Sequence, residues 1–428
     1  MNENIFHSNI KIIQERWPLI ALSIYKSNNK LCATLISCAF NTIAINNLQI
    51  CSRYNPHQEA LVQSKTIPPT EIVTLYGFGM GHLAQYLLEQ RPEIKKIQLV
   101  ILNVDVVFTI LHTIDLSAIL ENKKIELLMG NDEAKIRYPY FAHSPDLQLC
   151  DTSCVRLRNL ISHDKTIQYN QHRFNSLQDD ITERITSNLE LIQTDGDVSV
   201  FFDSAIEKKA LVIGAGPTLD QSLQWCKQQL DSTDRPLIIA VDTALKPLAQ
   251  FHIKPDIVVS IDMHKRDKFY YVGMEQTPLV YAPILANEVL RAWPGPRYVT
   301  YFNLPAYDTW KKSHPKGSLK CLSSVIHTAT DLAVKMGAKD IYFLGADFGF
   351  PKGKSYAQSL EKFSKPQDHL TEWLLDGHGN KIYTQPNMLG YLLDLEIYIQ
   401  SQPQIRFYNT SRDGATIAGT SYINHAKL

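Results

Sequence analysis

Apolar runs alternate with helical patterns along the second half of the chain. The runs LVIG, LIIAVD, DIVVSID and DIYFLGAD, found between residues 211 and 347, have the length and apolar content of buried strands. Between the first two runs, Leu219, Leu223, Cys226 and Leu230 recur at the spacing of one helix face. Such alternation predicts parallel strands with helices packed on the faces of the sheet. We therefore expect an α/β fold, Rossmann-like and mostly parallel, in this half.

A smaller unit of the same kind is predicted near the N-terminus. The run IVTLY (Ile72–Tyr76) is typical of a strand, and a loop with three glycines (Gly77–Gly81) leads from it into the helical pattern HLAQYLLEQ. This loop resembles the nucleotide turn of methyltransferase-like Rossmann units, in which an acidic residue after the next strand binds a ribose hydroxyl. Asn103 holds that position, with Asp105 two residues later. The sequence thus favours packing or acceptor docking over a second nucleotide site.

A polar, helix-leaning stretch separates the two α/β segments. Its sequences RLRNLI and NSLQDDITERITSNLELI show no strand-like alternation. We expect a Rossmann-like domain over residues 1–150, a helical connector over 151–207 and a larger α/β domain over 208–428.

Composition narrows the class of protein. The 428 residues suggest two or three domains at roughly 100 to 200 residues each. Because 43 basic residues balance 43 acidic ones, nucleic acid is not an expected partner. No apolar stretch reaches the about 20 residues of a membrane span, and the N-terminus lacks the order of a signal peptide, which predicts a cytoplasmic protein. The seven cysteines are scattered, so neither structural disulfides nor structural zinc is expected.

The strongest local motif follows the first strand of the larger domain. Gly214, Ala215, Gly216, Pro217 and Thr218 join that strand to a helical pattern. Glycines let the backbone approach a phosphate, Thr218 is a candidate N-cap, and the helix N-terminus supplies free N–H groups. The loop predicts an anionic, nucleotide-type ligand; a tight turn without any ligand is the alternative.

Acidic residues follow three of the predicted strands. Asp242, Asp262 and Asp347 each stand where a strand leaves the sheet. Ligands of open α/β sheets bind beyond the carboxyl ends of the strands, so we expect these residues to share a cleft. A divalent cation such as Mg²⁺ is possible there, but IDMH lacks the paired carboxylates that such an ion prefers. The metal requirement stays open.

Five segments together resemble the motility-associated factor family. They are GAGPTLDQSL, AVDTALKPLAQFHIKPDIVVSID, SSVIHTATDLAVKMGAKDIYFLGADFGF, DGHGNKIYTQPNMLGYLLDLE and FYNTSRDGATIAGT, in that order, and cover about 208–428. The resemblance implies a glycosyltransferase that moves a nonulosonic acid, pseudaminic or legionaminic, onto Ser or Thr of flagellin. Flagellin is the implied partner.

The same half is also similar, more distantly, to bacterial sialyltransferases that use a CMP-activated donor. Their donor loop, helix-start serine, later tyrosine and Gly-His motif correspond to Gly214–Leu219, Ser323 or Ser324, Tyr356 and Gly377–His378. Gly349 and Phe350 stand where the pattern has its first tyrosine, which leaves Tyr356 to contact the phosphate.

This resemblance implies a division of chemical roles. A CMP-sugar has an activated anomeric bond, so the enzyme must stabilise the departing phosphate and deprotonate an acceptor hydroxyl. The loop amides, Ser323 or Ser324, and Tyr356 are expected to do the first. His378 is the expected base, since an imidazole titrates near neutral pH. His264 and His327 are its rivals, and Asp347 is a further catalytic candidate.

Two other functions remain open. The catalytic half also resembles archaeal 6-hydroxymethyl-7,8-dihydropterin diphosphokinases, which share the glycine loop and strand-end aspartates and use ATP with magnesium. A non-catalytic flagellin-binding module is the third interpretation.

Overall fold

The structure is a computed structural model in which the chain forms two compact units, Met1–Asp164 and Lys165–Leu428. Each unit is described by itself. The residues described are 2–27, 31–37, 40, 42–132, 135–175, 178–263, 273–302, 307–321, 324–357 and 372–423.

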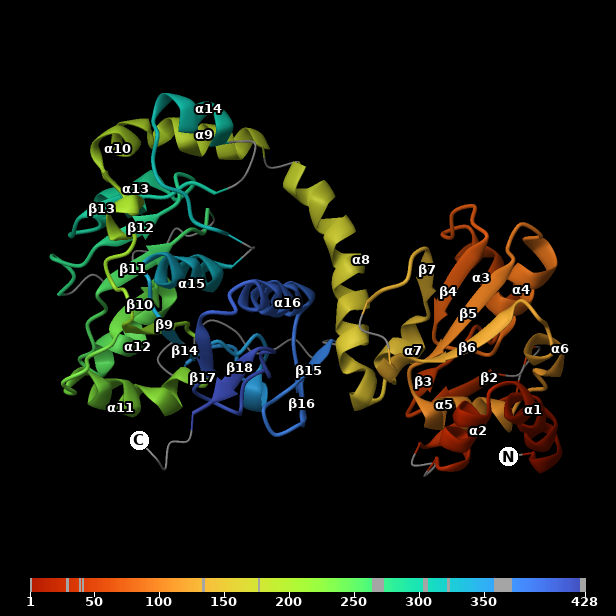
Figure 1. Cartoon of the computed structure of the whole chain (residues 1–428). Coiled ribbons are helices and arrows are strands. Elements are labelled where there is room, and N and C mark those ends of the chain that lie inside the picture. Colours follow the sequence, from red (N-terminus) through yellow and green to blue (C-terminus); the bar gives the residue numbers. More distant parts are fainter. Residues whose placement is uncertain are drawn as a thin grey trace. The chain divides into compact units, whose positions relative to one another are not determined.

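The first unit is built on a four-stranded parallel sheet with the order β6-β5-β4-β7 (Figure 1). A small antiparallel sheet, β1-β2-β3, belongs to the same unit. The strands are β1 (Ala33–Ile36), β2 (Thr42–Ile45), β3 (Leu48–Gln49), β4 (Ile72–Tyr76), β5 (Lys96–Ile101), β6 (Ile125–Met129) and β7 (Tyr140–Ala142). The helices are α1 (Glu3–Arg16), α2 (Pro18–Tyr25), α3 (Pro56–Ser64), α4 (His82–Gln90), α5 (Val104–Leu111), α6 (Ser117–Leu120), η1 (Gly130–Asp132), α7 (Ser144–Gln148) and η2 (Thr152–Cys154).

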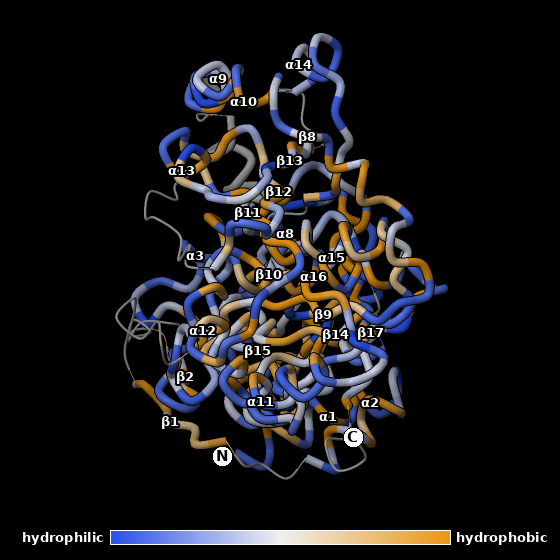
Figure 2. The backbone as a smooth tube through the Cα atoms, turned by 90° about the vertical axis from the view of Figure 1, so that its left-hand side faces the viewer, coloured by the Kyte–Doolittle hydropathy of each residue, from blue (hydrophilic) through white to orange (hydrophobic). Residues whose placement is uncertain are grey.

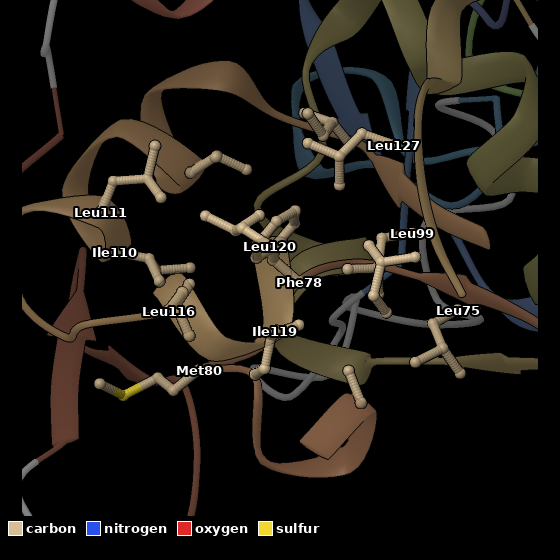
Figure 3. Close-up of a cluster of buried hydrophobic side chains, with 14 of the residues drawn as sticks. Leu75, Phe78, Met80, Leu99, Ile110, Leu111, Leu116, Ile119, Leu120 and Leu127 are labelled. Atoms are coloured by element: carbon tan, nitrogen blue, oxygen red, sulfur yellow. The ribbon is translucent and has the colours of Figure 1, made fainter. Parts of the chain in front are cut away.

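The core of this unit lies between the sheet and its helices. Figure 3 shows side chains of β4, β5 and β6, such as Leu75, Leu99 and Leu127, beside side chains of α5 and α6. Burial of each such leucine contributes roughly 1.5–3 kcal/mol to folding. This apolar contact holds the helices against the parallel strands.

The second unit is built on a nine-stranded sheet in which every neighbouring pair is parallel. Its order is β18-β17-β14-β9-β10-β11-β12-β13-β8. The strands are β8 (Gly196–Asp197), β9 (Lys209–Ile213), β10 (Leu237–Val241), β11 (Ile257–Ser260), β12 (Leu279–Tyr281), β13 (Arg297–Val299), β14 (Asp340–Leu344), β17 (Arg406–Asn409) and β18 (Thr420–Tyr422), with β15 (Trp373–Leu375) and β16 (Lys381–Tyr383) forming a separate antiparallel pair.

Helices cover both faces of this sheet, as right-handed crossovers require when the strand order runs outward in two directions from β9. Figure 1 shows α11 and α12 on one side of the sheet, with α15 and α16 on the other. The helices are α9 (Gln178–Ser187), α10 (Leu189–Thr194), η3 (Val198–Phe201), α11 (Leu219–Leu230), η4 (Asp242–Ala244), α12 (Leu245–Gln250), α13 (Asn287–Ala292), α14 (Asp308–Ser313), α15 (Val325–Lys335), η6 (Pro351–Gly353) and α16 (Pro386–Gln400).

The hydropathy of the second unit follows this layering. In Figure 2 the tube is orange through the central strands, whose residues are almost all buried, and blue prevails in α14, which buries none of its residues. The described residues contain no helix that is both long and apolar enough to cross a membrane.

The predicted fold class is confirmed: the chain is α/β, with parallel Rossmann-like sheets in both halves. The boundary between the two units differs from the predicted domain boundaries. The units meet at Asp164, inside the helix α8 (Val155–Asn175), rather than at 150 and 207. The expected connector also supplies β8, an edge strand that pairs with β13. A strand of two residues is too short to show alternation in the sequence.

A buried carboxylate fixes the glycine loop of the first unit. Asp146 accepts hydrogen bonds from the N–H groups of Phe78 (2.9 Å) and Gly79 (3.3 Å) and lies 2.6 Å from Nδ1 of His143. Gly77 has φ +100°, and a Cβ on it would meet the Asp146 side chain at 2.4 Å, so only glycine fits. Asn103, which occupies the position of the usual ribose-binding acid, caps α5 by accepting a hydrogen bond from the Asp105 N–H.

We expect Asp146→Ala to lower the free energy of unfolding of the first unit by about 3 kcal/mol, because it leaves buried N–H groups unpaired. Denaturant unfolding of the full chain measures this loss. The matched control is Asp115→Ala, which removes an exposed carboxylate that also accepts a backbone N–H, from Ser117, and should cost about 1 kcal/mol. Equal losses in the two variants would contradict the structural role given to Asp146.

Candidate active site

A cavity of about 200 Å³ opens at the carboxyl ends of β9 and β14. The chain leaves these neighbouring strands toward opposite faces of the sheet, and such a switch point is where open α/β sheets bind ligands. The walls come from the glycine loop, the start of α15, the segment 345–349, Ser355 with Tyr356, and α16. The cavity lies beyond the carboxyl ends of the strands, but of the three strand-end aspartates expected to share a cleft, Asp347 alone is among its lining residues.

The glycine loop is tied closely to the loop after β14. The Gly214 N–H donates to Leu344 O (2.8 Å), and the Gly216 N–H donates to Gly345 O (2.9 Å). A Cβ on Gly216 would lie 2.4 Å from an Asp347 carboxylate oxygen. Glycine is thus required here for contact with the protein's own loop. The Ala215 N–H, which faces the same cavity wall, has no hydrogen-bond partner in the described part of the chain.

Asp347 closes the N-terminus of α11. Its carboxylate accepts hydrogen bonds from the N–H (2.8 Å) and the hydroxyl (2.5 Å) of Thr218. Thr218 holds the N-cap position as predicted, but its side chain makes no capping hydrogen bond. Burial raises the pKa of Asp347 to about 6, against the lowering effect of the two bonds from Thr218. The structure gives Asp347 a positioning role; its assignment as a catalytic residue stays a prediction.

The start of α15 forms another wall of the cavity. Ser324 is the N-cap residue, and its N–H donates to Nδ1 of His327 (3.1 Å). Because Nδ1 accepts, Nε2 carries the proton and donates to Tyr391 O (2.8 Å). Burial lowers the pKa of His327, which favours this neutral form. His327, the alternative candidate for the general base, is therefore buried and hydrogen-bonded to two residues of the cavity wall, Ser324 and Tyr391. Ser323 lies outside the described residues.

Tyr356 lies near two of the predicted aspartates. Burial, followed by the charges of Asp262 and Asp242, raises the pKa of Tyr356, so its hydroxyl keeps its proton at neutral pH. Asp242 is buried and accepts hydrogen bonds from Ser260 (2.6 Å) and Thr243 (2.9 Å). Asp262 is exposed. The three strand-end aspartates therefore differ in role: Asp347 bonds to Thr218 after the glycine loop, and the charges of the other two act on Tyr356.

His378 lies on the turn between β15 and β16, and it is not among the residues that line the cavity. Its side chain is half exposed, and Nε2 lies 3.3 Å from Asp413. Asp413 also accepts hydrogen bonds from Lys352 (2.8 Å) and Gln221 (3.0 Å). His378 is thus oriented by a carboxylate, as a general base often is, and its catalytic role stays a prediction. His264 lies outside the described residues.

Some wall residues could not be identified from the sequence. Ser355, Thr243, Met388 and Tyr391 line the cavity, but nothing in their local pattern distinguishes them from other loop and helix residues. Only the position of Ser355 next to Tyr356 offered a signal. Within the described residues, no group of three or more His, Cys, Asp or Glu side chains is placed to hold a metal ion.

The pKa of Asp347 predicts a pH-dependent stability. Since the folded pKa of about 6 exceeds the unfolded value of 3.8, this carboxyl group stabilises the fold at low pH, and the benefit is lost as pH rises from about 4 through 6. The full difference is about 3 kcal/mol. Asp347→Asn should remove this dependence. Denaturant unfolding of parent and variant at pH 4.5 and pH 7.5 measures it, with the exposed Asp231→Asn as control. A parallel pH dependence in parent and Asp347→Asn would contradict the prediction.

Comparison with known proteins gives three findings. A family described as 6-hydroxymethylpterin diphosphokinase MptE-like matches residues 183–353, less than half of the chain. An uncharacterized protein of Treponema pallidum (strain Nichols) is 22% identical over 260 residues, which are 55% of this chain and 44% of that protein. The chain thus matches less than half the length of this relative. A solved structure, of a MAf glycosyltransferase from Magnetospirillum magneticum AMB-1, has 17% sequence identity and a TM-score of 0.46, with 100% of this chain and 76% of the other covered.

Proposed function

We propose that the chain is a glycosyltransferase that moves a nonulosonic acid, sialic-acid-like and of the pseudaminic or legionaminic type, from a CMP-activated donor to Ser or Thr hydroxyls of flagellin. The proposal rests on one observation, the carboxylate that is bonded at a helix N-terminus beside the cavity. Asp347 bonds to the N–H and the hydroxyl of Thr218 at the N-terminus of α11, so a second phosphoryl group at this helix end would meet a carboxylate. A donor that leaves with one phosphate suits this arrangement better than a diphosphate.

Tyr356 has the properties needed beside a leaving phosphate. Its hydroxyl stays protonated because its pKa is raised by burial and by the carboxylates of Asp262 and Asp242. A protonated phenol can donate a hydrogen bond to the oxygen on which negative charge develops. The two carboxylates would repel that phosphate and suit hydroxyl groups of the ribose or the sugar instead. Tyr356 thus supplies the cavity with a donor for the phosphate, and the two carboxylates near it would be acceptors for hydroxyls.

The transfer itself needs one proton to move. As the acceptor oxygen bonds to the anomeric carbon, the bond from that carbon to the phosphate oxygen breaks, and CMP leaves with the electron pair. The hydroxyl proton passes to a base, and we assign this role to His378, which Asp413 orients. No step of this scheme requires a divalent cation, and whether Mg²⁺ assists departure of the phosphate is open to measurement.

A diphosphokinase is the second candidate, because the matching family model spans the glycine loop and all three strand-end aspartates. Such an enzyme would bind ATP with magnesium. Calorimetric titration of the protein with CMP and with ATP and magnesium separates the two candidates. Binding of CMP supports the glycosyltransferase, binding of ATP and magnesium alone supports the kinase, and binding of neither leaves the non-catalytic flagellin-binding module.

We expect Tyr356→Phe to lower the rate of transfer by about 10²- to 10³-fold while CMP affinity changes little, because the lost hydrogen bond is strongest in the transition state. Steady-state kinetics with CMP-pseudaminic and CMP-legionaminic acid measure the rate, and calorimetry measures the affinity. A matched control is Tyr383→Phe, which alters an exposed tyrosine on β16. An equal loss of rate and affinity would place Tyr356 in ground-state binding.

We expect His378→Ala to reduce transfer to flagellin by about 10²- to 10⁴-fold. Hydrolysis of the donor should fall less, since water attack on a labile CMP-sugar depends less on the base. Both reactions are measured in the same preparation, with CMP affinity as a check on folding. Transfer within a few-fold of the parent would exclude His378 as the base.

A further inference from the structure

Long helices begin at the edge of the sheet where the cavity opens, among them α11, α15 and α16. In a parallel sheet, the helix that precedes a strand starts at the carboxyl edge, and this is true of α11, before β10, and of α15, before β14. Each helix N-terminus presents N–H groups that attract an anion. At α11 the Thr218 N–H is already bonded to the Asp347 carboxylate. A negative ligand would be repelled from that position.

The N-terminus of α15 remains open. Ser324 is bonded to Nδ1 of His327, whereas the N–H groups of Val325 and Ile326 have no hydrogen-bond partner within the described residues. Both residues line the cavity. The bond from Nε2 of His327 to Tyr391 O fixes this first turn against α16. A rigid pair of donors therefore faces the cavity, with no carboxylate bonded to it.

A second, independent feature points to a ligand at the same place. Ser355 is only 8% exposed and lines the cavity, yet its hydroxyl has no hydrogen-bond partner among the residues that the structure describes. A buried hydroxyl that lacks a partner is costly, so such groups usually serve a ligand or an ordered water. Ser355 precedes Tyr356, whose hydroxyl also stays protonated.

We propose that Ser355 Oγ and the first turn of α15, at Val325 and Ile326, together bind the phosphate of the nucleotide. This inference rests on the proposed function, and it places the phosphate at α15 and not at α11, the helix of the glycine loop. The ligand class is a nucleoside monophosphate, free or as the leaving group of an activated sugar. The glycine loop shapes the cavity wall through Asp347.

The test compares ligands with and without the phosphate. Calorimetry gives the affinities of CMP and cytidine for the parent, for Ser355→Ala and for the control Ser232→Ala, which alters an exposed serine after α11. Hydrogen bonds to charged groups are strong, so Ser355→Ala should weaken CMP binding by about 10- to 100-fold and leave cytidine binding unchanged. Ser355→Thr, which keeps a hydroxyl, should retain most of the CMP affinity.

A stability measurement separates a ligand role from a structural one. Because the Ser355 hydroxyl has no partner in the described part of the protein, Ser355→Ala should unfold at the same denaturant concentration as the parent, or at a higher one. Unchanged CMP affinity in Ser355→Ala, or equal losses for CMP and cytidine, would overturn the inference. So would a destabilised variant whose CMP affinity falls only in proportion to its unfolded fraction.

Failure of the proposed function gives a different result. If the parent binds ATP and magnesium but not CMP, the glycosyltransferase is wrong, and the same variants are titrated with ATP and with adenosine. A loss confined to ATP would uphold the phosphate site, and a loss shared with adenosine would overturn it. If the parent binds no nucleotide, both proposals are wrong.

Discussion

One interaction recurs in both units: a buried carboxylate that closes a glycine loop across the switch point of a parallel sheet. In the second unit, Asp347, which follows β14, accepts a hydrogen bond from the backbone N–H of Thr218. In the first unit, Asp146, which follows β7, accepts hydrogen bonds from the backbone N–H groups of Phe78 and Gly79. Each carboxylate comes from the strand beside the one that ends in the glycine loop. Gly77 and Gly216 are required beside these carboxylates, because a Cβ on either would lie 2.4 Å from the Asp146 or Asp347 side chain.

The cavities beside the two glycine loops differ in volume, although a buried carboxylate closes both loops. In the first, the imidazole of His143 packs against Gly79, and the cavity beside the loop is only about 20 Å³. In the second, the corresponding wall carries small residues, Ala346 and Gly349, and a cavity of about 200 Å³ remains. A glycine loop is therefore not sufficient for a ligand site, because the side chains across the switch point decide whether room is left.

Local patterns explain how much of this was predictable. The α/β class, the principal strands and both glycine loops follow from apolar runs and helical spacing within short windows, and the structure confirms the class. The partners of the loops do not follow, since Thr218 and Asp347 are 129 residues apart in the sequence. Without that contact, Thr218 looks like a capping residue and Asp347 like a group that faces the ligand. For Ser355 the one local signal was its position next to Tyr356, because its significance lies in a hydroxyl that has no partner among the described residues.

These contacts favour an anion at the N-terminus of α15 over one at the N-terminus of α11. The glycine motif indicates an anion at α11. The N–H groups of Val325 and Ile326, which have no partner among the described residues, belong instead to α15, on the other side of the sheet (Figure 1). The donors of the proposed phosphate site therefore flank β14, with α15 before it and Ser355 after it. The match to the diphosphokinase-like family ends at residue 353, before Ser355 and Tyr356. Ser355 and Tyr356, on which the two proposals rest, thus lie beyond the matched segment, whereas Val325 and Ile326 lie inside it.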